Sequence, residues 1–233
     1  MVDLYKKRSN WSDYAERIRS LDDYPVGDPI VGGIVGEAVD LGLSVKWGSW
    51  NVGASSPEEY GAYFAWGETD VKWDYNWNTY KWTYDNNAAV FTKYVKDIGY
   101  GTIDNLTVLD LEDDAARANW GASWRMPTQR EMKELIDNCN SVLTTVNGVY
   151  GLLFTSKIEG YSDRSVFFPS TGFRSDSVLD DSLDETYYWT STLCLHYSFS
   201  SQACYLRFTS GGPSVIEIGC SRYLGLPVRP VCD

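Results

Sequence analysis

The stretch DDAARANWGASWRMPTQREMKELIDNC, residues 113–139, carries the strongest secondary-structure signals in the chain. Thr128 and Glu131 have the T-x-x-E spacing of a capping box, which predicts that a helix begins there. Four apolar residues then recur at i, i+3, i+4 and i+7 and give this helix one buried face: Met132, Leu135, Ile136 and Cys139. A shorter helix is predicted upstream, over 111–119, with aspartates in its first turn, where negative charge suits the helix dipole.

β-Strand patterns dominate the chain after these helices. The pair Asn147-Gly148 is a hairpin signal, because both residues tolerate the positive φ of a tight turn. Another strand is expected before the helices, over residues 39–45. Short runs rich in β-branched and aromatic residues predict the later strands 151–157, 165–169, 186–192, 203–209, 214–218 and 227–231. Two helices followed by a run of short strands predict an α+β domain.

Two segments before the helices are less regular. Residues 55–100 are polar and aromatic, so we expect a loop-rich insertion held in place by its tryptophans. Residues 9–21 predict a short helix, which is marginal alone in water and must dock on the domain or on another subunit. Glycines and prolines in residues 22–38 indicate a linker or an extended arm. The expected organisation is therefore an N-terminal helix and arm, 1–37, and one domain, 38–233.

Several large side chains have structural interpretations. We expect Trp120, Trp124 and Trp189 in the core, because nearby glycines allow close backbone approach. Arg125 is expected to pair with a carboxylate and to fix the segment before the capped helix. Arg229, between Val228 and Pro230 in the last strand, is expected to do the same.

Composition excludes several classes of protein. Lys plus Arg number 20 and Asp plus Glu 32, so the formal net charge is -12, which argues against binding to nucleic acid or an anionic membrane. No apolar run reaches the roughly 20 residues of a membrane span. His196 is the single histidine, so multi-histidine zinc sites are excluded. The five cysteines form no CxxC pair, so a zinc ribbon or thioredoxin motif is absent.

Five motifs follow one another along residues 38–231: VDLGLSVKWGSWNVGASSPEEYGAYFAWGET, DDAARANWGASWRMPTQREMKELIDNC, FFPSTGFR, YYWTST and PVRPV. Together they resemble the Fibrobacter succinogenes major paralogous domain family, which is abundant in Bacteroidetes. The resemblance implies an α+β, C-type lectin-like domain with two helices, short antiparallel strands and long aromatic-rich loops. Its last strands and loops would form a ligand-binding face. Family members are mostly exported, yet residues 1–20 show no apolar core like that of a signal peptide.

The segment from Tyr187 to Tyr205 contains no Asp, Glu, Lys or Arg. In this composition, a run of that length avoids charge only about one time in a hundred. Its middle, LCLHYSFSSQ, lies between two predicted strands and is expected to be a surface loop. The apolar side chains of such a loop would be exposed and would mark a binding site. The alternative is that this segment folds inward as core.

Codon chemistry bears on the same segment. In some C-type lectin-like proteins, retroelements randomise adenines, and an AAC codon treated in this way never encodes Trp, Met, Gln, Glu or Lys. The run from Leu193 to Phe199 stays within the permitted set, as a random run of that length does about one time in three. It also has no periodicity typical of a strand, as expected for a sampled binding loop. The ligand-binding residues predicted on this basis are Leu193, Cys194, Leu195, His196, Tyr197, Ser198, Phe199, Ser201, Cys220, Ser221, Tyr223, Leu224 and Leu226.

Enzyme sites fit the sequence less well. His196 and Ser198 with a distant aspartate could be drawn as a catalytic triad, but nothing in the sequence orients the histidine. Formylglycine-generating enzymes use a fold related to the C-type lectins and need a reactive cysteine pair. Cys194 or Cys204 could meet Cys220 here, but the surrounding sequence does not match. No catalytic residue and no cofactor are predicted.

Metal sites are weighed on two acidic clusters. The first lies at a helix start and is expected to be solvated: Asp110, Glu112, Asp113 and Asp114. The second, in residues 176–184, has a better loop context and stays open as an alternative. No metal site is predicted.

The sequence thus predicts a non-enzymatic ligand-binding protein, of the adhesin or receptor type, with a C-terminal face that a retroelement diversifies. Its partner would be a protein or a glycan, with no nucleic acid and no membrane insertion. The alternative is a structural surface or virion component, such as a phage tail-tip protein, that forms a homo-oligomer through its N-terminal segment. Both functions place the protein outside the cell, on a cell surface or on a virion.

Overall fold

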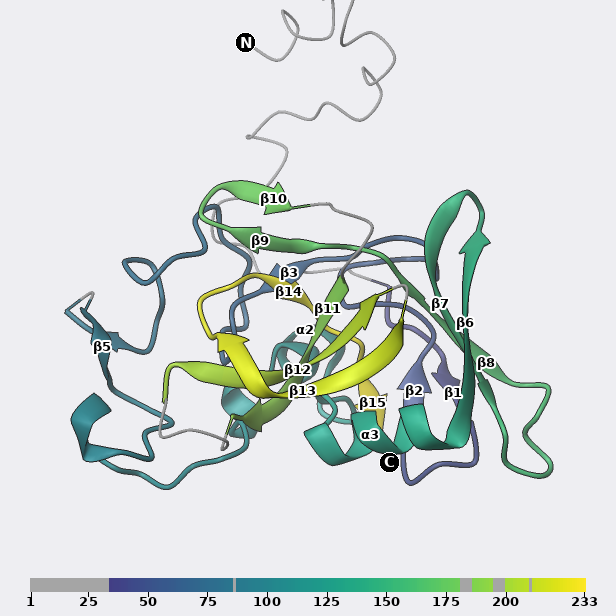
Figure 1. Ribbon diagram of the computed structural model, residues 1–233, viewed down its shortest axis with the longest axis horizontal. Helices are drawn as coiled ribbons and strands as arrows, with labels where there is room; N and C mark the ends of the chain where they lie inside the picture. Colours follow the sequence, from purple (N-terminus) through teal and green to yellow (C-terminus); the bar gives the residue numbers. More distant parts are fainter. Residues whose placement is uncertain (1–33, 86, 181–185, 195–199, 210) are drawn as a thin grey trace, which may run out of the picture.

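Strands dominate the molecule, and most of them form small antiparallel sheets (Figure 1). The computed structural model describes residues 34–85, 87–180, 186–194, 200–209 and 211–233. Of the described residues, 39% are strand and 12% are helix, so the prediction of an α+β, C-type lectin-like domain is wrong and the fold is β-rich. The physical reason is that the α-helices in the described part of the chain are short, while the segments expected to be loops contribute strands of their own.

Three sheets have three strands each, in the orders β6-β7-β8, β11-β12-β13 and β1-β2-β15. Their strands are β6 (Cys139–Val146), β7 (Val149–Ser156), β8 (Ser165–Pro169), β11 (Thr186–Leu193), β12 (Gln202–Thr209), β13 (Gly212–Ser221), β1 (Ala38–Val39), β2 (Lys46–Gly48) and β15 (Val231–Cys232). Three sheets have two strands each: β3 (Tyr63–Phe64) with β14 (Leu226–Pro227), β4 (Thr83–Tyr84) with β5 (Asn87–Phe91), and β9 (Phe173–Ser175) with β10 (Val178–Asp180). The prediction of a strand over 39–45 is wrong, because only Val39 of that range belongs to a strand. The strand predicted over 227–231 is interrupted, since only its first and last residues belong to β14 and β15.

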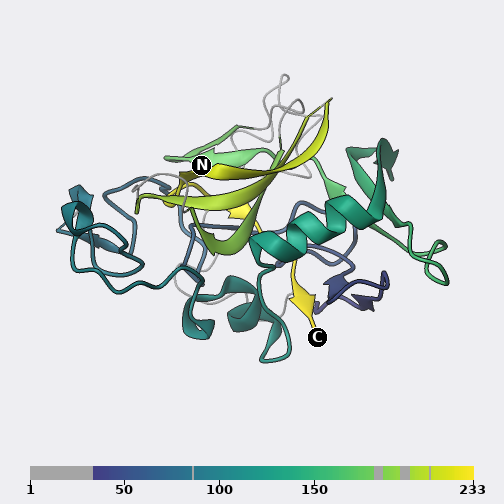
Figure 2. The ribbon, with the colours of Figure 1, turned by 60° about the horizontal axis from the view of Figure 1, so that its bottom comes forward.

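The capped helix is confirmed as α3 (Gln129–Asn138). Thr128 accepts from the Glu131 amide and the Glu131 side chain accepts from the Thr128 amide, which completes the capping box. The helix crosses beside the β11-β12-β13 sheet in Figure 2, and it packs on these strands through Met132 and Leu135, both fully buried. The start of the helix is therefore confirmed, and so is the burial of Met132 and Leu135. Ile136 is half-buried, and the placement of Cys139 on the helix is wrong, because Cys139 begins β6.

The helix predicted over 111–119 is interrupted. A single 3-10 turn, η4 (Leu111–Asp113), is followed by α2 (Ala115–Trp120), and Asp114 lies between them in an extended conformation. The Asp114 side chain accepts from the amide of Arg117, so this aspartate caps α2 rather than lying inside a longer helix. A second 3-10 turn, η3 (Ile98–Tyr100), lies in the aromatic insertion.

The predicted hairpin at Asn147-Gly148 joins β6 to β7. Asn147 has φ 48° and Gly148 has φ 84°, the positive values that a two-residue turn of this kind requires. The ladder then runs without a shift from Val146 opposite Val149 to Cys139 opposite Ser156.

Two large apolar clusters form most of the core. One surrounds Trp66 and Trp189, and it includes Trp120 and Trp124, whose ring centroids lie 5.0 Å apart, so the expected burial of these tryptophans is confirmed. The other surrounds Trp47 and joins α3 to strands of three sheets. A third cluster, of tyrosines and Phe91, supports the aromatic insertion.

The two predicted arginine ion pairs have different outcomes. Arg125 donates to both carboxylate oxygens of Glu131, at 2.8 and 2.6 Å, which confirms that it fixes the start of α3. Arg229 is fully buried and donates instead to Asn51 Oδ1 and to the carbonyl oxygens of Gly48 and Phe167. The prediction of a carboxylate partner for Arg229 is therefore wrong, because Asn51 Oδ1 and two backbone carbonyl oxygens accept the hydrogen bonds of its guanidinium.

Residues 34–37 pack against the domain. Trp50 Nε1 donates to the carbonyl of Ile34 at 2.9 Å, and a Cβ added to Gly36 would lie 2.7 Å from the ring of Trp120. The helix predicted over 9–21, and with it most of the arm proposed for assembly, lies outside the described residues.

Candidate functional site

The predicted binding residues fall into three groups by burial. Leu193, Cys194 and Leu226 are buried, with 0%, 2% and 0% exposure, so the prediction that they face solvent is wrong. Leu193 ends β11 and Leu226 belongs to β14, and both pack into the cluster around Trp189. Residues 195–199, which include Leu195, His196, Tyr197, Ser198 and Phe199, lie outside the described part of the chain. The others are half-buried: Ser201, Cys220, Ser221, Tyr223 and Leu224.

The predicted binding residues belong to two segments, 193–201 and 220–226. The structure brings the described parts of these segments together at one end of the β11-β12-β13 sheet. Gln202 pairs with Ser221, and the amide of Arg222 donates to the carbonyl of Ser201 at 3.0 Å. The described residues on either side of 195–199 are held by the fold, because the amide of Cys194 donates to Gln202 O and Ser200 is buried.

Arg222 is the residue that sequence reasoning missed. It is fully buried, and its guanidinium donates from Nε to Tyr80 Oη at 2.8 Å, from Nη1 to Ser200 O at 2.7 Å and from Nη2 to Lys93 O at 3.1 Å. These three acceptors come from distant parts of the chain. One side chain thus connects the aromatic insertion to both predicted binding segments.

Aromatic rings surround the Arg222 guanidinium. Its carbon lies 4.9 Å from the ring centroid of Phe91 and 5.0 Å from that of Trp66, within range of cation–π attraction. Burial raises the pKa of Tyr80 above its ordinary value, although the nearby Arg222 charge opposes this rise. The Tyr80 hydroxyl therefore stays neutral near pH 7 and accepts from Arg222 without becoming its counter-ion.

The aromatic insertion lies beside the second predicted segment. Trp77 contacts Tyr223 edge to face, with ring centroids 4.8 Å apart, and makes similar contacts with Tyr80 and Phe91. Gly225 lets the same segment approach Tyr75, because a Cβ at Gly225 would lie 2.6 Å from the ring of Tyr75. We call the following set the Arg222 platform: Trp77, Tyr80, Ser200, Ser201, Arg222 and Tyr223.

The thiols near the platform are poorly suited to nucleophilic chemistry. Burial raises the pKa of Cys220 well above its ordinary value, and the neighbouring thiol of Cys194 adds to the rise. A reactive cysteine needs the opposite shift, because the thiolate is the nucleophile. The triad sketched on His196 and Ser198 lies outside the described residues.

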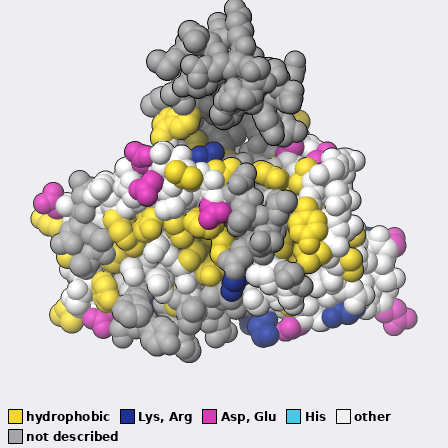
Figure 3. All heavy atoms as spheres, turned by 45° about the horizontal axis from the view of Figure 1, so that its top comes forward, with side chains coloured by type: hydrophobic (Ala, Val, Ile, Leu, Met, Phe, Trp, Pro, Cys, Tyr) yellow, Lys and Arg dark blue, Asp and Glu magenta, His cyan; other side chains and the backbone are white. Residues whose placement is uncertain are grey.

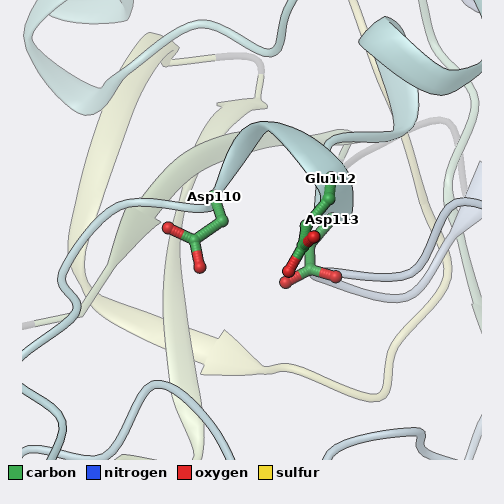
Figure 4. A group of neighbouring side chains, drawn as sticks. All are labelled: Asp110, Glu112 and Asp113. Atoms are coloured by element: carbon green, nitrogen blue, oxygen red, sulfur yellow. The ribbon is translucent and has the colours of Figure 1, made fainter.

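The first acidic cluster is not simply solvated as predicted. Asp113 and Asp114 are buried, with 2% and 3% exposure, whereas Asp110 and Glu112 are more exposed. Carboxylate oxygens of Asp110, Glu112 and Asp113 gather within 4.8 Å of one another (Figure 4). Asp114 instead caps α2 and accepts from the amide of Met126. Two of the four carboxylates are therefore buried and have structural partners, whereas the other two are more exposed.

The ammonium group of Lys93 already lies among these carboxylates. Lys93 Nζ lies 2.6 Å from Asp110 Oδ2 and 2.7 Å from Asp113 Oδ2. Burial alone would lower the pKa of Lys93, but its hydrogen bonds with Asp110 and Asp113 raise it overall. Burial likewise opposes ionisation of Asp113, but hydrogen bonds from Lys93, Tyr94 and Lys81 hold the pKa of Asp113 below its ordinary value. Because the Lys93 ammonium already pairs with these carboxylates, we propose no metal site here.

Calcium is therefore expected to leave the thermal midpoint of the native chain unchanged. A Lys93→Gln variant should have a lower midpoint, because Asp113 loses a buried partner, and calcium should restore part of that loss. Differential scanning calorimetry with calcium, and with magnesium as a control, measures both effects. A calcium-dependent rise in the midpoint of the native chain would contradict the assignment of Lys93 as the resident cation.

The second acidic cluster is only partly described. Asp176 accepts from Asn76 Nδ2 at 3.1 Å and pairs with Tyr75 through the backbone, so it anchors the insertion. Residues 181–184 lie outside the described part of the chain.

Comparisons with protein-family models, with curated proteins and with solved structures found no match to this chain. In the described part of the chain, no helix combines the length and the apolar character needed to cross a bilayer.

Proposed function

We propose that this chain is a non-enzymatic ligand-binding protein that binds through residues 195–199 and the half-buried residues around the Arg222 platform. The observation that carries the proposal is the bonding of Arg222, which ties the base of segment 195–199 to the aromatic insertion. A rigid base reduces the entropy that a binding loop loses when it meets a ligand. The hydrogen bonds of Arg222 to Tyr80, Ser200 and Lys93 involve none of residues 195–199, so sequence change there leaves these bonds in place.

The surroundings of the platform favour a protein or glycan ligand. Trp77 and Tyr223 are half-buried and offer rigid aromatic area with a polar edge, which suits both classes of ligand. Figure 3 brings forward the top of the molecule in Figure 1 and shows hydrophobic side chains across that face. A location outside the cell, on a cell surface or a virion, belongs to this proposal.

Retroelement diversification is proposed for a smaller set of positions than the sequence suggested. Leu193, Cys194 and Leu226 are core residues, and randomising them would destabilise the fold. The positions left are residues 195–199 and the half-buried Ser201, Cys220, Ser221, Tyr223 and Leu224. Sequencing of the locus tests the idea: NNC codons at these positions, a near-identical template repeat and a nearby reverse transcriptase are expected. Codons ending in A or G at most of them, with no such repeat, would remove this part of the proposal.

Replacing Tyr197 and Phe199 together by alanine is expected to abolish binding and to leave the thermal midpoint within about 2 °C of the native value. Binding of the fluorescently labelled chain to a glycan array and to intact bacterial cells provides the measurement. Val178→Ala, an exposed apolar position in β10, is the matched control and should bind as the native chain does. Undiminished binding by the double variant would place the site elsewhere, and a collapsed thermal transition would show that these side chains belong to the core.

A further inference from the structure

Strand β6 is an edge of the β6-β7-β8 sheet (Figure 1). In a two-residue hairpin, the residues that flank the turn exchange hydrogen bonds, and such pairs then alternate along the ladder. Val146 and Val149 flank the turn here, so the even-numbered residues of β6 bond to β7. The N–H and C=O groups of Ser141, Leu143 and Thr145 consequently point away from β7. Residues of β6 lie near α3 and β13, but among the described residues no hydrogen bond reaches the outward backbone groups of Ser141, Leu143 and Thr145.

This edge lacks the features that usually protect one. Natural edge strands are blunted by lysine, proline, a bulge or a short length, because unpaired backbone groups attract another strand. Strand β6 has eight residues, CNSVLTTV, and its ladder shows no register shift. Val142 is 58% exposed, and neighbouring Asn140 and Ser141 are exposed as well. Of the residues whose backbone groups point outward, Ser141 and Thr145 are exposed and Leu143 is half-buried, so the middle of the strand is open to pairing.

Charge identifies a second copy of this chain as the occupant. The net charge is -12, so two copies repel one another over most of their surfaces. Residues 138–156, which include β6, its turn and β7, contain no Asp, Glu, Lys, Arg or His. Two copies that meet at this hairpin therefore bring no like charges of the hairpin itself together.

We propose that β6 pairs with β6 of a second copy across a two-fold axis at Leu143 and forms one continuous six-stranded antiparallel sheet. Antiparallel pairing about this axis places Ser141 of each copy opposite Thr145 of the other. The outward groups of residues 141, 143 and 145 then exchange on the order of six hydrogen bonds. The dimer is isologous, since the same edge serves both copies, and the Arg222 platform takes no part in it.

Sedimentation equilibrium on the full chain tests the proposal between about 1 μM and about 500 μM. The mass should rise with concentration from 26.3 kDa towards twice that value. Added salt should strengthen association, because it screens repulsion between the acidic copies. A single 26.3 kDa species over the whole range would overturn the proposal and leave the edge for a strand of another protein.

Charge exchange at two positions tests the register. Ser141→Glu with Thr145→Glu places carboxylates opposite one another across the axis and should abolish the dimer. Ser141→Glu with Thr145→Lys creates two opposite-charge pairs between copies and should restore it. The two positions lie about 13 Å apart along one strand, too far for an ion pair within a copy. Val178→Glu with Thr102→Glu adds the same charge at exposed positions elsewhere and should dimerise as the native chain does.

Circular dichroism first establishes that each variant keeps the native strand content and thermal midpoint. A folded Ser141→Glu/Thr145→Glu variant that still dimerises would overturn the pairing. So would a folded Ser141→Glu/Thr145→Lys variant that stays monomeric, because the proposed register places these groups together.

Discussion

Arg222→Met is expected to lower the free energy of unfolding by about 3 kcal/mol, because several buried or part-buried oxygens lose their donor at once. These acceptors are the Tyr80 hydroxyl and the carbonyl oxygens of Ser200 and Lys93. Methionine fills much of the space but donates no hydrogen bond. The free energy of unfolding therefore falls because these oxygens lose their donor, and not because a cavity forms. Urea unfolding monitored by tryptophan fluorescence measures it.

Two further variants separate charge from geometry. Arg222→Lys keeps the positive charge but can reach fewer acceptors, so we expect a loss intermediate between methionine and the native chain. Arg130→Met removes an exposed arginine on α3 and should change stability by no more than about 0.5 kcal/mol. If Arg222→Met unfolds at the native urea concentration, the guanidinium does not hold the platform. The proposed binding site then loses its base.

Elements defined by local sequence were predicted well. The capping box at Thr128 and Glu131 and the turn at Asn147-Gly148 depend on residues within four positions of one another, and both are confirmed. Strand β8 has the predicted bounds. By contrast, β3 and β4 have two residues each and carry no periodicity that a sequence could show. Their contribution to a β-rich fold was therefore invisible in the sequence.

Arg222 could not be assigned from the sequence because its partners are distant. Tyr80 lies 142 residues away and Ser200 lies 22 residues away. An arginine within an otherwise uncharged segment near Cys220 is the one available signal. The chain carries Arg229 in a similar setting a few residues later, and its partners are also carbonyl oxygens.

Two charge-free runs have different structures. The uncharged run from Tyr187 to Tyr205 is mostly β11 and β12, and the majority of its described side chains are buried, as the alternative of an inward-folded segment expected. Residues 138–156 are equally free of charge, yet they include a hairpin whose outer strand is partly exposed. The absence of charge in a sequence therefore does not by itself distinguish a buried segment from an exposed one.

Replacing Trp189 is the second change with a large expected effect. Trp189 and Trp66 are fully buried and bond each other's backbone segments: Trp189 Nε1 donates to Phe64 O and Trp66 Nε1 donates to Thr190 O, both at 2.8 Å. This reciprocal pair ties β11 to the start of the aromatic insertion. Trp189→Ala removes the ring and its hydrogen bond, so the free energy of unfolding should fall by about 3–5 kcal/mol.

Trp47 provides the matched control, because it is equally buried but its indole N–H has no hydrogen-bond partner among the described residues. Replacing either tryptophan by phenylalanine removes a similar volume, but only Trp189→Phe also breaks a hydrogen bond. Trp47→Phe removes a buried N–H that has no acceptor and is therefore unfavourable in the folded state. The decrease in the free energy of unfolding should be smaller for Trp47→Phe than for Trp189→Phe by about 1–2 kcal/mol. Urea unfolding of the two phenylalanine variants measures the difference. Equal losses would mean that ring volume alone accounts for the stabilisation and that the indole–carbonyl bonds between β11 and the insertion contribute little.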